Sequence, residues 1–488
     1  MVRDLQLFLK QLEAVGELKH IGVEVDPYLE LGAIADKVSK ELGGGSALLF
    51  DRVKGSSMPV AINIFGSLRR IVMALSSGKD VTSLDDVAAR IEKLIQAAMP
   101  RAGSNFFEKL SKIPLLAEVS SWMPKTVGRG LCQEVVLYGS EARLSILPVL
   151  TTWPDDGGPF ITMGLSHTVS RSGQRNMGLY RLQKHDDFTL GFHAHLHHDG
   201  AKACYGYSCG ERMPVAVSLG GDPVLTYAAT APLPPFISEI MFAGFLRGKG
   251  LEMVRCLTND LEVPADSEIV IEGWIDPNEL RREGPFGDHT GYYSLADDYP
   301  VIHVEAITHR VNPVFPATIV GRPPKEDYYL GLATERIFLP ILKLVIPEVV
   351  DIHLPSVGSF HNLVIIAIHK EFPGHPQKVM NAIWGTSQMM FSKVVVVVDH
   401  DIDPSNMDEV LFRVTSNVDP RRDLLFTDGP LDVLDHSSDR FAFGSKVGID
   451  ATRNSSRLDG FSREWPADLV FPDEILKRIN DRWGEYGF

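Results

Sequence analysis

Residues 268–275 read EIVIEGWI and residues 301–311 read VIHVEAITHRV, and runs of this kind decide the fold of the middle of the chain. Both runs are rich in β-branched residues, and turn-forming residues stand close to their ends, as is typical of short strands. Gly, Pro and Asp turns separate them from three similar runs, at residues 134–138, 160–169 and 213–220. The spacing predicts a β-barrel or a β-sandwich in this part of the chain.

Helical and α/β patterns flank the β-rich segment. Apolar residues recur at helical spacing near the start and again before the glycines at 43–45, which predicts two amphipathic helices. Ser83 and Asp86 have the spacing of a capping box ahead of another helix. The last third alternates strand and helix, with LVIIAI at 363–368 and KVVVVVD at 393–399 as strands, which predicts a βαβ unit.

The length of 488 residues exceeds what one hydrophobic core supports, and about 150 residues per domain suggests about three domains. We therefore expect a multidomain α/β (α+β) protein. Its parts are an N-terminal α/β domain at 1–114, a central β-rich domain at 115–325 and a C-terminal α/β domain at 326–488.

The composition limits the partners and the compartment. A net charge of −15 opposes binding to a phosphate backbone, so no nucleic acid partner is expected. The four cysteines are too sparse for a disulfide framework and indicate reduced thiols. No targeting segment is evident, and the longest aliphatic run, VVVVV at 394–398, is far shorter than the roughly 18 residues of a spanning helix. We expect a cytoplasmic protein with no membrane span.

Residues 283–293, EGPFGDHTGYY, place Glu283, Asp288 and His289 among glycines and a proline. Glycine and proline account for a tight bend, but they do not require ionisable side chains. The carboxylates are either ordinary soluble turn residues or part of a functional site, and only partners elsewhere in the chain can decide.

A second dense stretch, residues 175–200, contains alternating histidines at 193, 195 and 197. Alternate residues of a strand share one face, so three imidazoles could meet at one metal ion. An exposed strand that happens to be histidine-rich is the other interpretation. Glu239, on a helix directly after a loop, is a further candidate ligand.

Several stretches together resemble the UbiD family of decarboxylases, which act on aromatic and α,β-unsaturated acids with prenylated FMN. The resemblance extends to about residue 455 and implies that the central domain is a split β-barrel that binds the flavin. The stretches that carry it are LEAVGELK, NMGLYR, SEIMFAGFLRG, NDLEVPADSEIVIEG, EGPFGDHTGYY, GRPP and GSKVGIDAT.

The resemblance implies that Asn176, His197 and Glu239 hold Mn²⁺ or Mg²⁺ against the cofactor phosphate, with K⁺ as a further cation. Amide and carboxylate oxygens with one imidazole suit these metals. It selects His197 and leaves His193 and His195 without an assigned role. The implied cofactor-binding residues are Asn176, Leu179, Tyr180, Arg181, Leu196, His197, Glu239 and Lys378.

The resemblance also places Arg181, Glu283 and Asp288 in the catalytic network of the family. We expect Arg181 to keep Glu283 ionised, while Asp288, less well paired, holds a proton for delivery. Some relatives carry Glu where this chain has Asp288, so the substrates of those relatives are not a safe guide to the substrate of this chain. His289 either bonds a neighbouring side chain or contacts the substrate.

The implied activity is a non-oxidative, reversible decarboxylation of an aromatic acid, with a polyprenylated 4-hydroxybenzoate of ubiquinone biosynthesis as the first substrate and other hydroxyaryl acids as alternatives. The implied partners are a flavin prenyltransferase that supplies the cofactor and further copies of the chain. An FMN-dependent oxidoreductase on a split barrel and a catalytically silent flavin-binding protein are the competing hypotheses. The presence of Arg181, Glu283 and Asp288 together favours the decarboxylase.

Overall fold

The computed structural model describes residues 4–76, 81–98, 113–193, 204, 206–208, 210–234 and 237–487. A four-stranded sheet near the N-terminus has the order β1-β2-β3-β14, and its last strand comes from a segment far along the chain. The strands are β1 (Leu18–Val25), β2 (Ala47–Val53), β3 (Val60–Ile62) and β14 (Phe315–Pro316). The helices are α1 (Leu5–Ala14), α2 (Glu30–Ser39), α3 (Leu68–Leu75), α4 (Leu84–Ala98) and α6 (Ile113–Ser121).

The predicted N-terminal helices and cap are confirmed. Helix α1 buries Leu5, Phe8, Leu9 and Leu12, the apolar residues that repeat at helical spacing in the sequence. Before α4, the Ser83 backbone N–H donates to Asp86 Oδ2 at 2.8 Å, and the Asp86 N–H donates to Ser83 Oγ at 3.2 Å. These two bonds satisfy backbone donors that the first turn of a helix leaves free.

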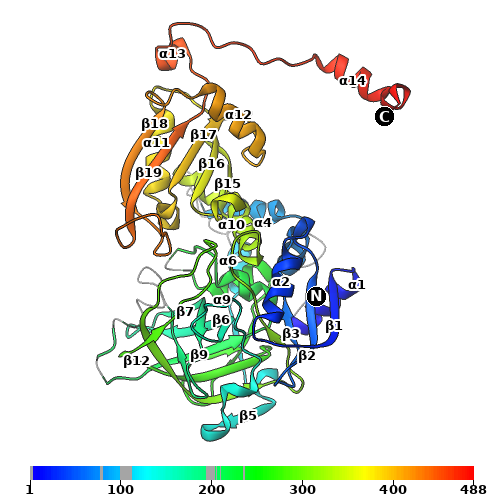
Figure 1. The fold of residues 1–488 in the computed structure, drawn as a ribbon, viewed down its shortest axis with the longest axis vertical. Coiled ribbons are helices and arrows are strands. Elements are labelled where there is room, and N and C mark those ends of the chain that lie inside the picture. The colour runs from blue at the N-terminus through cyan, green and yellow to red at the C-terminus, as the bar shows by residue number, and fades with distance from the viewer. Residues whose placement is uncertain are drawn as a thin grey trace.

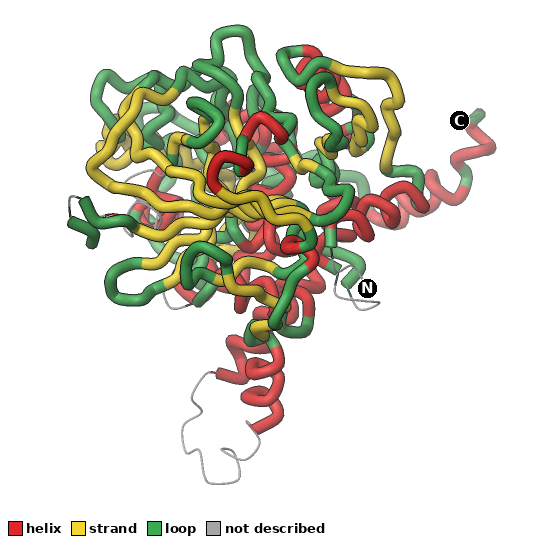
Figure 2. The backbone as a smooth tube through the Cα atoms, turned by 90° about the horizontal axis from the view of Figure 1, so that it is seen from below, coloured by secondary structure: helices red, strands yellow, loops and turns green. Residues whose placement is uncertain are grey.

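The middle of the chain is dominated by an antiparallel sheet of order β5-β13-β12-β9-β6-β7, to which β8 adds by pairing with β13 (Figures 1 and 2). Its strands are β5 (Val135–Tyr138), β6 (Phe160–Val169), β7 (Arg175–Gln183), β8 (Thr189–Gly191), β9 (Met213–Leu219), β12 (Ile269–Glu283) and β13 (Asp297–His309). A small sheet contains β4 (Lys125–Val127), β10 (Glu252–Arg255) and β11 (Glu262–Pro264). Two helices, α8 (Pro223–Ala228) and α9 (Glu239–Arg247), follow β9.

The predicted β-rich central domain is therefore observed, but its sheet does not close into a barrel among the described residues. Among the described residues no strand ladder joins β7 to β8, and a single bridge, between Lys184 and Leu190, links these two segments. The chain is a mixed α/β multidomain protein in this structure, and the split barrel stays a prediction.

The C-terminal third forms a separate layer with the sheet order β15-β16-β17-β19-β18. Strands β16 and β17 are parallel and are joined through α11, which confirms the predicted βαβ unit. The strands are β15 (Val349–His353), β16 (Leu363–Ile368), β17 (Val394–Asp399), β18 (Leu424–Pro430) and β19 (Phe443–Asp450). The helices are α10 (Glu326–Val345), α11 (His375–Trp384), α12 (Met407–Asn417), α13 (Ser456–Asp459) and α14 (Asp473–Asp481).

Helix α10 connects the central sheet to this layer, and the last residues extend away from the body as an arm that carries α14 (Figure 1). Short 3₁₀ turns complete the described chain at Leu42–Gly44, Leu131–Gln133, Gly139–Glu141, Leu144–Ile146, Ser356–Gly358, Ser387–Phe391 and Trp483–Tyr486. None of the helices in the described ranges is both long enough and apolar enough to cross a lipid bilayer.

Candidate active site

The turn that contains the two acids leaves β12 at Glu283 and packs against the segment before β6. Gly284 has a φ of 86°, a conformation that a side chain would strain. A Cβ on Gly287 would lie 2.1 Å from the indole of Trp153, so glycine is required for this close approach. The Gly287 N–H donates to Asp156 Oδ1 at 2.8 Å. These contacts fix the backbone that presents Glu283 and Asp288.

Arg181, on β7, reaches both carboxylates of the turn. Its Nε donates to Glu283 Oε1 at 3.1 Å, and its Nη1 donates to Asp288 Oδ2 at 2.5 Å. The guanidinium also lies over the ring of Phe286, with its Cζ 4.6 Å from the ring centroid. The side chain of Glu283 is fully buried, and those of Arg181 and Asp288 are each 9% exposed. Residues from two distant parts of the sequence thus form one buried acid, arginine and acid network.

The pairing within this network differs from the sequence-based expectation. Burial alone would raise the pKa of Asp288, but the hydrogen bonds and charge of His289 and the charge of Arg181 outweigh it and hold this pKa well below its usual range. Glu283, by contrast, has one buried oxygen, Oε2, without a hydrogen-bond partner among the described residues. The expectation that Asp288 is the less well paired acid is wrong in this structure, because Arg181 is long enough to reach both acids and His289 adds a second donor.

His289 bonds a neighbouring side chain on each side of its ring. Its Nδ1 donates to Asp288 Oδ1 at 2.9 Å, since an ionised carboxylate can only accept. Its Nε2 lies 2.7 Å from Nε2 of His361, in the C-terminal layer. Burial disfavours the imidazolium, yet the hydrogen bond and charge of Asp288, with smaller effects of Asp327 and Asp432, raise the pKa of His289 to about 9.

His193 joins the same network from the other side. Its Nδ1 lies 2.9 Å from Glu283 Oε1, and its ring packs on Tyr299 with centroids 4.1 Å apart. Burial lowers the pKa of His193, although the bond to Glu283 opposes this. The alternating histidines predicted His193 as a possible metal ligand. In the structure His193 instead bonds Glu283 and packs on Tyr299. His195, Leu196 and His197 lie outside the described residues.

Two of the three expected metal ligands lie beside each other. Glu239 begins α9, and its Oε2 accepts the N–H of Met177, the residue after Asn176 on β7. The side-chain nitrogen of Asn176 is buried and bonds no other described residue. The backbone next to Asn176 therefore lies beside Glu239 near the start of β7, and Leu179 and Tyr180 follow on the same strand towards Arg181.

Lys378 is not part of this cluster. It lies on α11, its side chain is 46% exposed, and its ammonium group pairs with Glu348. A surface ion pair of this kind needs no ligand to explain it. As a cofactor contact, Lys378 stays an expectation from the family resemblance.

The structure adds residues that the sequence did not indicate. His361 reaches the turn from the C-terminal layer, and Asp327, in the first turn of α10, lies close enough for its charge to affect His289. Burial raises the pKa of Asp327 to about 6, which the charge of His289 opposes. Asp327 lies three residues after the GRPP stretch at 321–324, so the resemblance marked its neighbourhood but not the residue.

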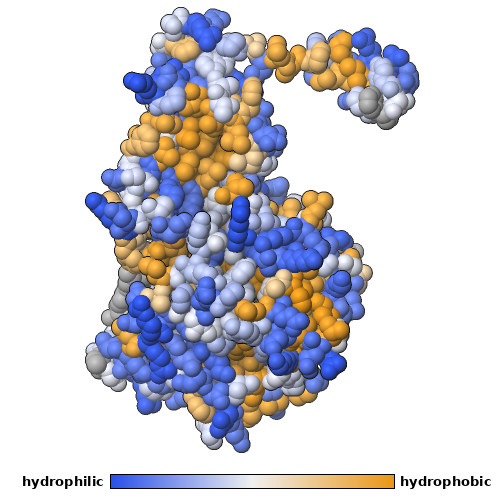
Figure 3. Space-filling model, in the orientation of Figure 1, coloured by the Kyte–Doolittle hydropathy of each residue, from blue (hydrophilic) through white to orange (hydrophobic). Residues whose placement is uncertain are grey.

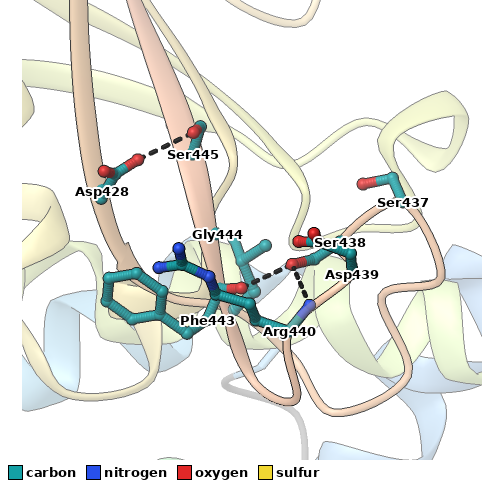
Figure 4. Close-up of a pocket in the computed structure, with 9 residues that line it drawn as sticks. Asp428, Ser437, Ser438, Asp439, Arg440, Phe443, Gly444 and Ser445 are labelled. Carbon is teal, nitrogen blue, oxygen red and sulfur yellow. Dashed lines mark hydrogen bonds between the residues drawn. The ribbon is translucent and has the colours of Figure 1, made fainter.

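A separate hollow of about 410 Å³ lies beside the β18–β19 hairpin (Figure 4). Its side chains bond one another: Ser445 donates to Asp428 at 2.7 Å, and Ser438 donates to the carbonyl of Phe443 at 2.5 Å. We assign it no role, because these bonds lie within the hairpin and its lining includes none of Arg181, Glu283 and Asp288. It is lined by Asp428, Leu431, Ser437, Ser438, Asp439, Arg440, Phe443, Gly444 and Ser445.

Comparison with known proteins gives one consistent result along the chain. Residues 9–91, 125–323 and 328–451 match the N-terminal, Rift-related and C-terminal domain models of 3-octaprenyl-4-hydroxybenzoate carboxy-lyase, UbiD. An uncharacterized protein of Aquifex aeolicus is 45% identical over 488 residues, which covers 99% of each chain.

Two solved structures extend this likeness to the fold. The vanillic acid decarboxylase of Sedimentibacter hydroxybenzoicus in its closed form has a TM-score of 0.83 at 27% identity and covers 99% of each chain. An evolved dimeric form of the UbiD-class enzyme HmfF from Pelotomaculum thermopropionicum, in complex with prFMN, has a TM-score of 0.75 at 28% identity. It covers 97% of this chain and 99% of its own. The chain belongs to the UbiD family.

Proposed function

We propose that this protein is a carboxy-lyase that removes CO₂ from an aromatic acid without oxidation, and that the reaction is reversible. One observation carries the proposal: Arg181 bonds Glu283 and Asp288 together in a buried site on one turn. An FMN-dependent oxidoreductase would have no use for two acids held by one arginine. A silent flavin-binding protein would not need to keep all three.

Prenylated FMN, when bound, would supply the electron sink that accepts the charge left by CO₂. The chain's own residues then have two tasks, to place the substrate and to return a proton to the ring carbon. Arg181 can bind a substrate carboxylate through charge-assisted hydrogen bonds. Residues Leu179, Tyr180, Leu196 and Lys378 are proposed to contact the cofactor.

The resting state holds the proton on His289, one hydrogen bond of 2.9 Å from Asp288. When substrate excludes water from the turn, the ion pair loses solvation and the neutral pair becomes more favourable. The proton then moves from Nδ1 of His289 to Oδ1 of Asp288, the N–H electron pair stays on Nδ1, and Asp288 delivers a proton to the carbon. This assignment keeps Asp288 as the proton donor and adds a source for its proton.

The residues present fit a divalent metal. Asn176 adjoins Met177, whose N–H bonds Glu239, so the two residues could offer an amide and a carboxylate oxygen, and His197 would complete the set. Mn²⁺ or Mg²⁺ there would neutralise the phosphate of the flavin, and K⁺ is a further proposed cation. A net charge of −15 is unfavourable for binding an anionic phosphate, and a cation at this place would offset that repulsion.

Replacing Asn176, His197 or Glu239 with alanine should lower manganese content and flavin retention together, by roughly tenfold or more in affinity. His193→Ala is the matched control, because His193 bonds Glu283 and should leave metal content unchanged. Metal analysis and flavin absorbance of the purified variants measure both. Loss of metal in His193→Ala with retention in His197→Ala would refute the ligand set.

The finer proposals follow the family resemblance. A polyprenylated 4-hydroxybenzoate is the first substrate to test, a flavin prenyltransferase supplies the cofactor, and the domains divide at about residues 114 and 325, with a split barrel in the centre. We also propose a homo-oligomer formed through the C-terminal domain. The extended arm supports this, because Leu469, Val470 and Phe471 are 104%, 81% and 69% exposed (Figures 1 and 3).

Expression with and without a flavin prenyltransferase tests the proposed function. With it, the protein should carry prenylated FMN, by mass and absorption, and release CO₂ from at least one acid in a panel of hydroxybenzoates and related aryl acids. Without it, the protein should be empty or hold plain FMN and be inactive. Full turnover with plain FMN would refute the proposal.

A further inference from the structure

A second histidine reaches the turn from a different part of the molecule. His361 lies in the connection between β15 and β16, whereas His289 lies on the turn after β12, and their Nε2 atoms are 2.7 Å apart. Ser359 and Phe360, just before His361, have φ values of 50° and 48°. A positive φ is unfavourable for residues other than glycine, so two such residues in succession indicate a backbone that the surrounding structure holds in place.

Phe360 packs between the turn and α10, and so supports the contact between His289 and His361. Its ring packs on His289 with centroids 5.4 Å apart, and a Cβ on Gly331 of α10 would lie 3.3 Å from it. The connection is therefore wedged between the turn and α10, and His361 is positioned by packing.

The direction of the bond between the two imidazoles follows from their charges. His289 is protonated, so its Nε2 donates and Nε2 of His361 must accept. Burial and the charge of His289 lower the pKa of His361 to about 4, so His361 is neutral and carries its proton on Nδ1. The order of groups is thus Asp288, His289, His361, with one charge-assisted bond on each side of the imidazolium.

We propose that His361 is a positioning residue for proton delivery: it accepts a hydrogen bond from His289 and so keeps the proton of His289 on the side of Asp288. The inference rests on the proposed function, in which Asp288 protonates the ring carbon. It adds that the C-terminal layer supplies a residue to the proton-handling site, although that site lies on the central sheet.

The other charged groups around the two rings do not replace this contact. Asp288 faces His289 from the turn, Asp327 acts on it from α10, and Asp432 acts from the C-terminal layer. Asp435 and Lys393, also in that layer, act on His361 with opposite signs. Asp288, Asp327 and Asp432 all favour a charged His289, but in the described part of the chain only Asp288 and His361 bond its ring nitrogens.

The test compares His361→Phe, which keeps an aromatic ring but has no acceptor, with His361→Gln, whose amide oxygen can accept. NMR titration of His289 in the full chain without cofactor should show a pKa lower by about one unit or more in His361→Phe, because the charged form has lost a partner. The pKa should lie closer to the wild-type value in His361→Gln. His361→Leu serves as a second variant without an acceptor.

The matched control is His436→Phe. His436 also contacts the turn from the C-terminal layer, with its ring centroid 4.1 Å from that of Tyr292, but it is exposed and is not among the groups that affect the pKa of His289. This variant should leave the titration of His289 unchanged.

With the cofactor present, product formation should depend on a protonated His289. The alkaline limb of the pH profile should therefore move to lower pH in His361→Phe and return towards the wild-type position in His361→Gln. An unchanged His289 pKa and an unchanged profile in both His361→Phe and His361→Leu would overturn the inference. The titration needs no catalysis, so a wild-type protein that releases no CO₂ would refute the proposed function without deciding this one.

Discussion

Asp288→Asn should bind metal and flavin normally and yet form product roughly 10² to 10⁴ times more slowly, which is the usual contribution of a general acid. Asparagine keeps the shape of Asp288 and can still contact His289, but it cannot carry a proton at a useful pKa. The measurement is the rate of product formation with the acid that the wild type decarboxylates, beside metal and flavin content. The control is Asp288→Glu, which restores a carboxylate one methylene further out and should retain part of the activity.

Wild-type rates in Asp288→Asn would contradict this role directly. A variant that lost metal and flavin as well would show that Asp288 is needed for assembly of the site, which the present account does not predict.

Arg181→Met should destabilise the fold by about 3–5 kcal/mol, because it leaves two buried carboxylates without their shared cation. Chemical denaturation at neutral pH measures this. The deficit should shrink at low pH, because Arg181 helps to hold the pKa of Asp288 well below its usual range and Asp288 loses its charge at higher pH in the variant than in the wild type. Activity should be lost as well, because no cation remains to hold the two acids.

The matched control is Arg282→Met, one residue before Glu283. The side chain of Arg282 is 63% exposed and approaches Asp297 and Asp298 only at 3.9 and 3.8 Å, so its loss should cost about 0–1 kcal/mol. Equal destabilisation by the two substitutions would show that the buried network is not a special source of stability.

Much of the fold could be predicted from local sequence patterns. The capping box at Ser83 and Asp86 and the apolar faces of the first helices are properties of neighbouring residues, and the structure reproduces them. The βαβ unit followed from a switch in periodicity. Strand β14 could not be anticipated, because Phe315 pairs with Val60, and no local signal marks so distant a partner.

For the site as well, the sequence predicted some features and could not predict others. The motif resemblance identified Arg181, Glu283 and Asp288, and the structure brings them together. It could not give the strength of each pairing, which depends on the reach of one guanidinium and on the place of His289. His361 is 72 residues from His289 in the sequence and becomes its neighbour only through the packing of the C-terminal layer.

The distinction between the two acids is the most direct test of the account, because Glu283 Oε2 is buried without a hydrogen-bond partner among the described residues, while Asp288 has the protonated neighbour. The measurement is incorporation of solvent deuterium at the product carbon in Asp288→Asn and in Glu283→Gln, each loaded with cofactor and metal. We predict that incorporation falls with product formation in Asp288→Asn, whereas Glu283→Gln impairs placement or cleavage of the substrate and still exchanges deuterium into added product. Exchange that persists in Asp288→Asn and disappears only in Glu283→Gln would contradict the account and assign proton delivery to Glu283.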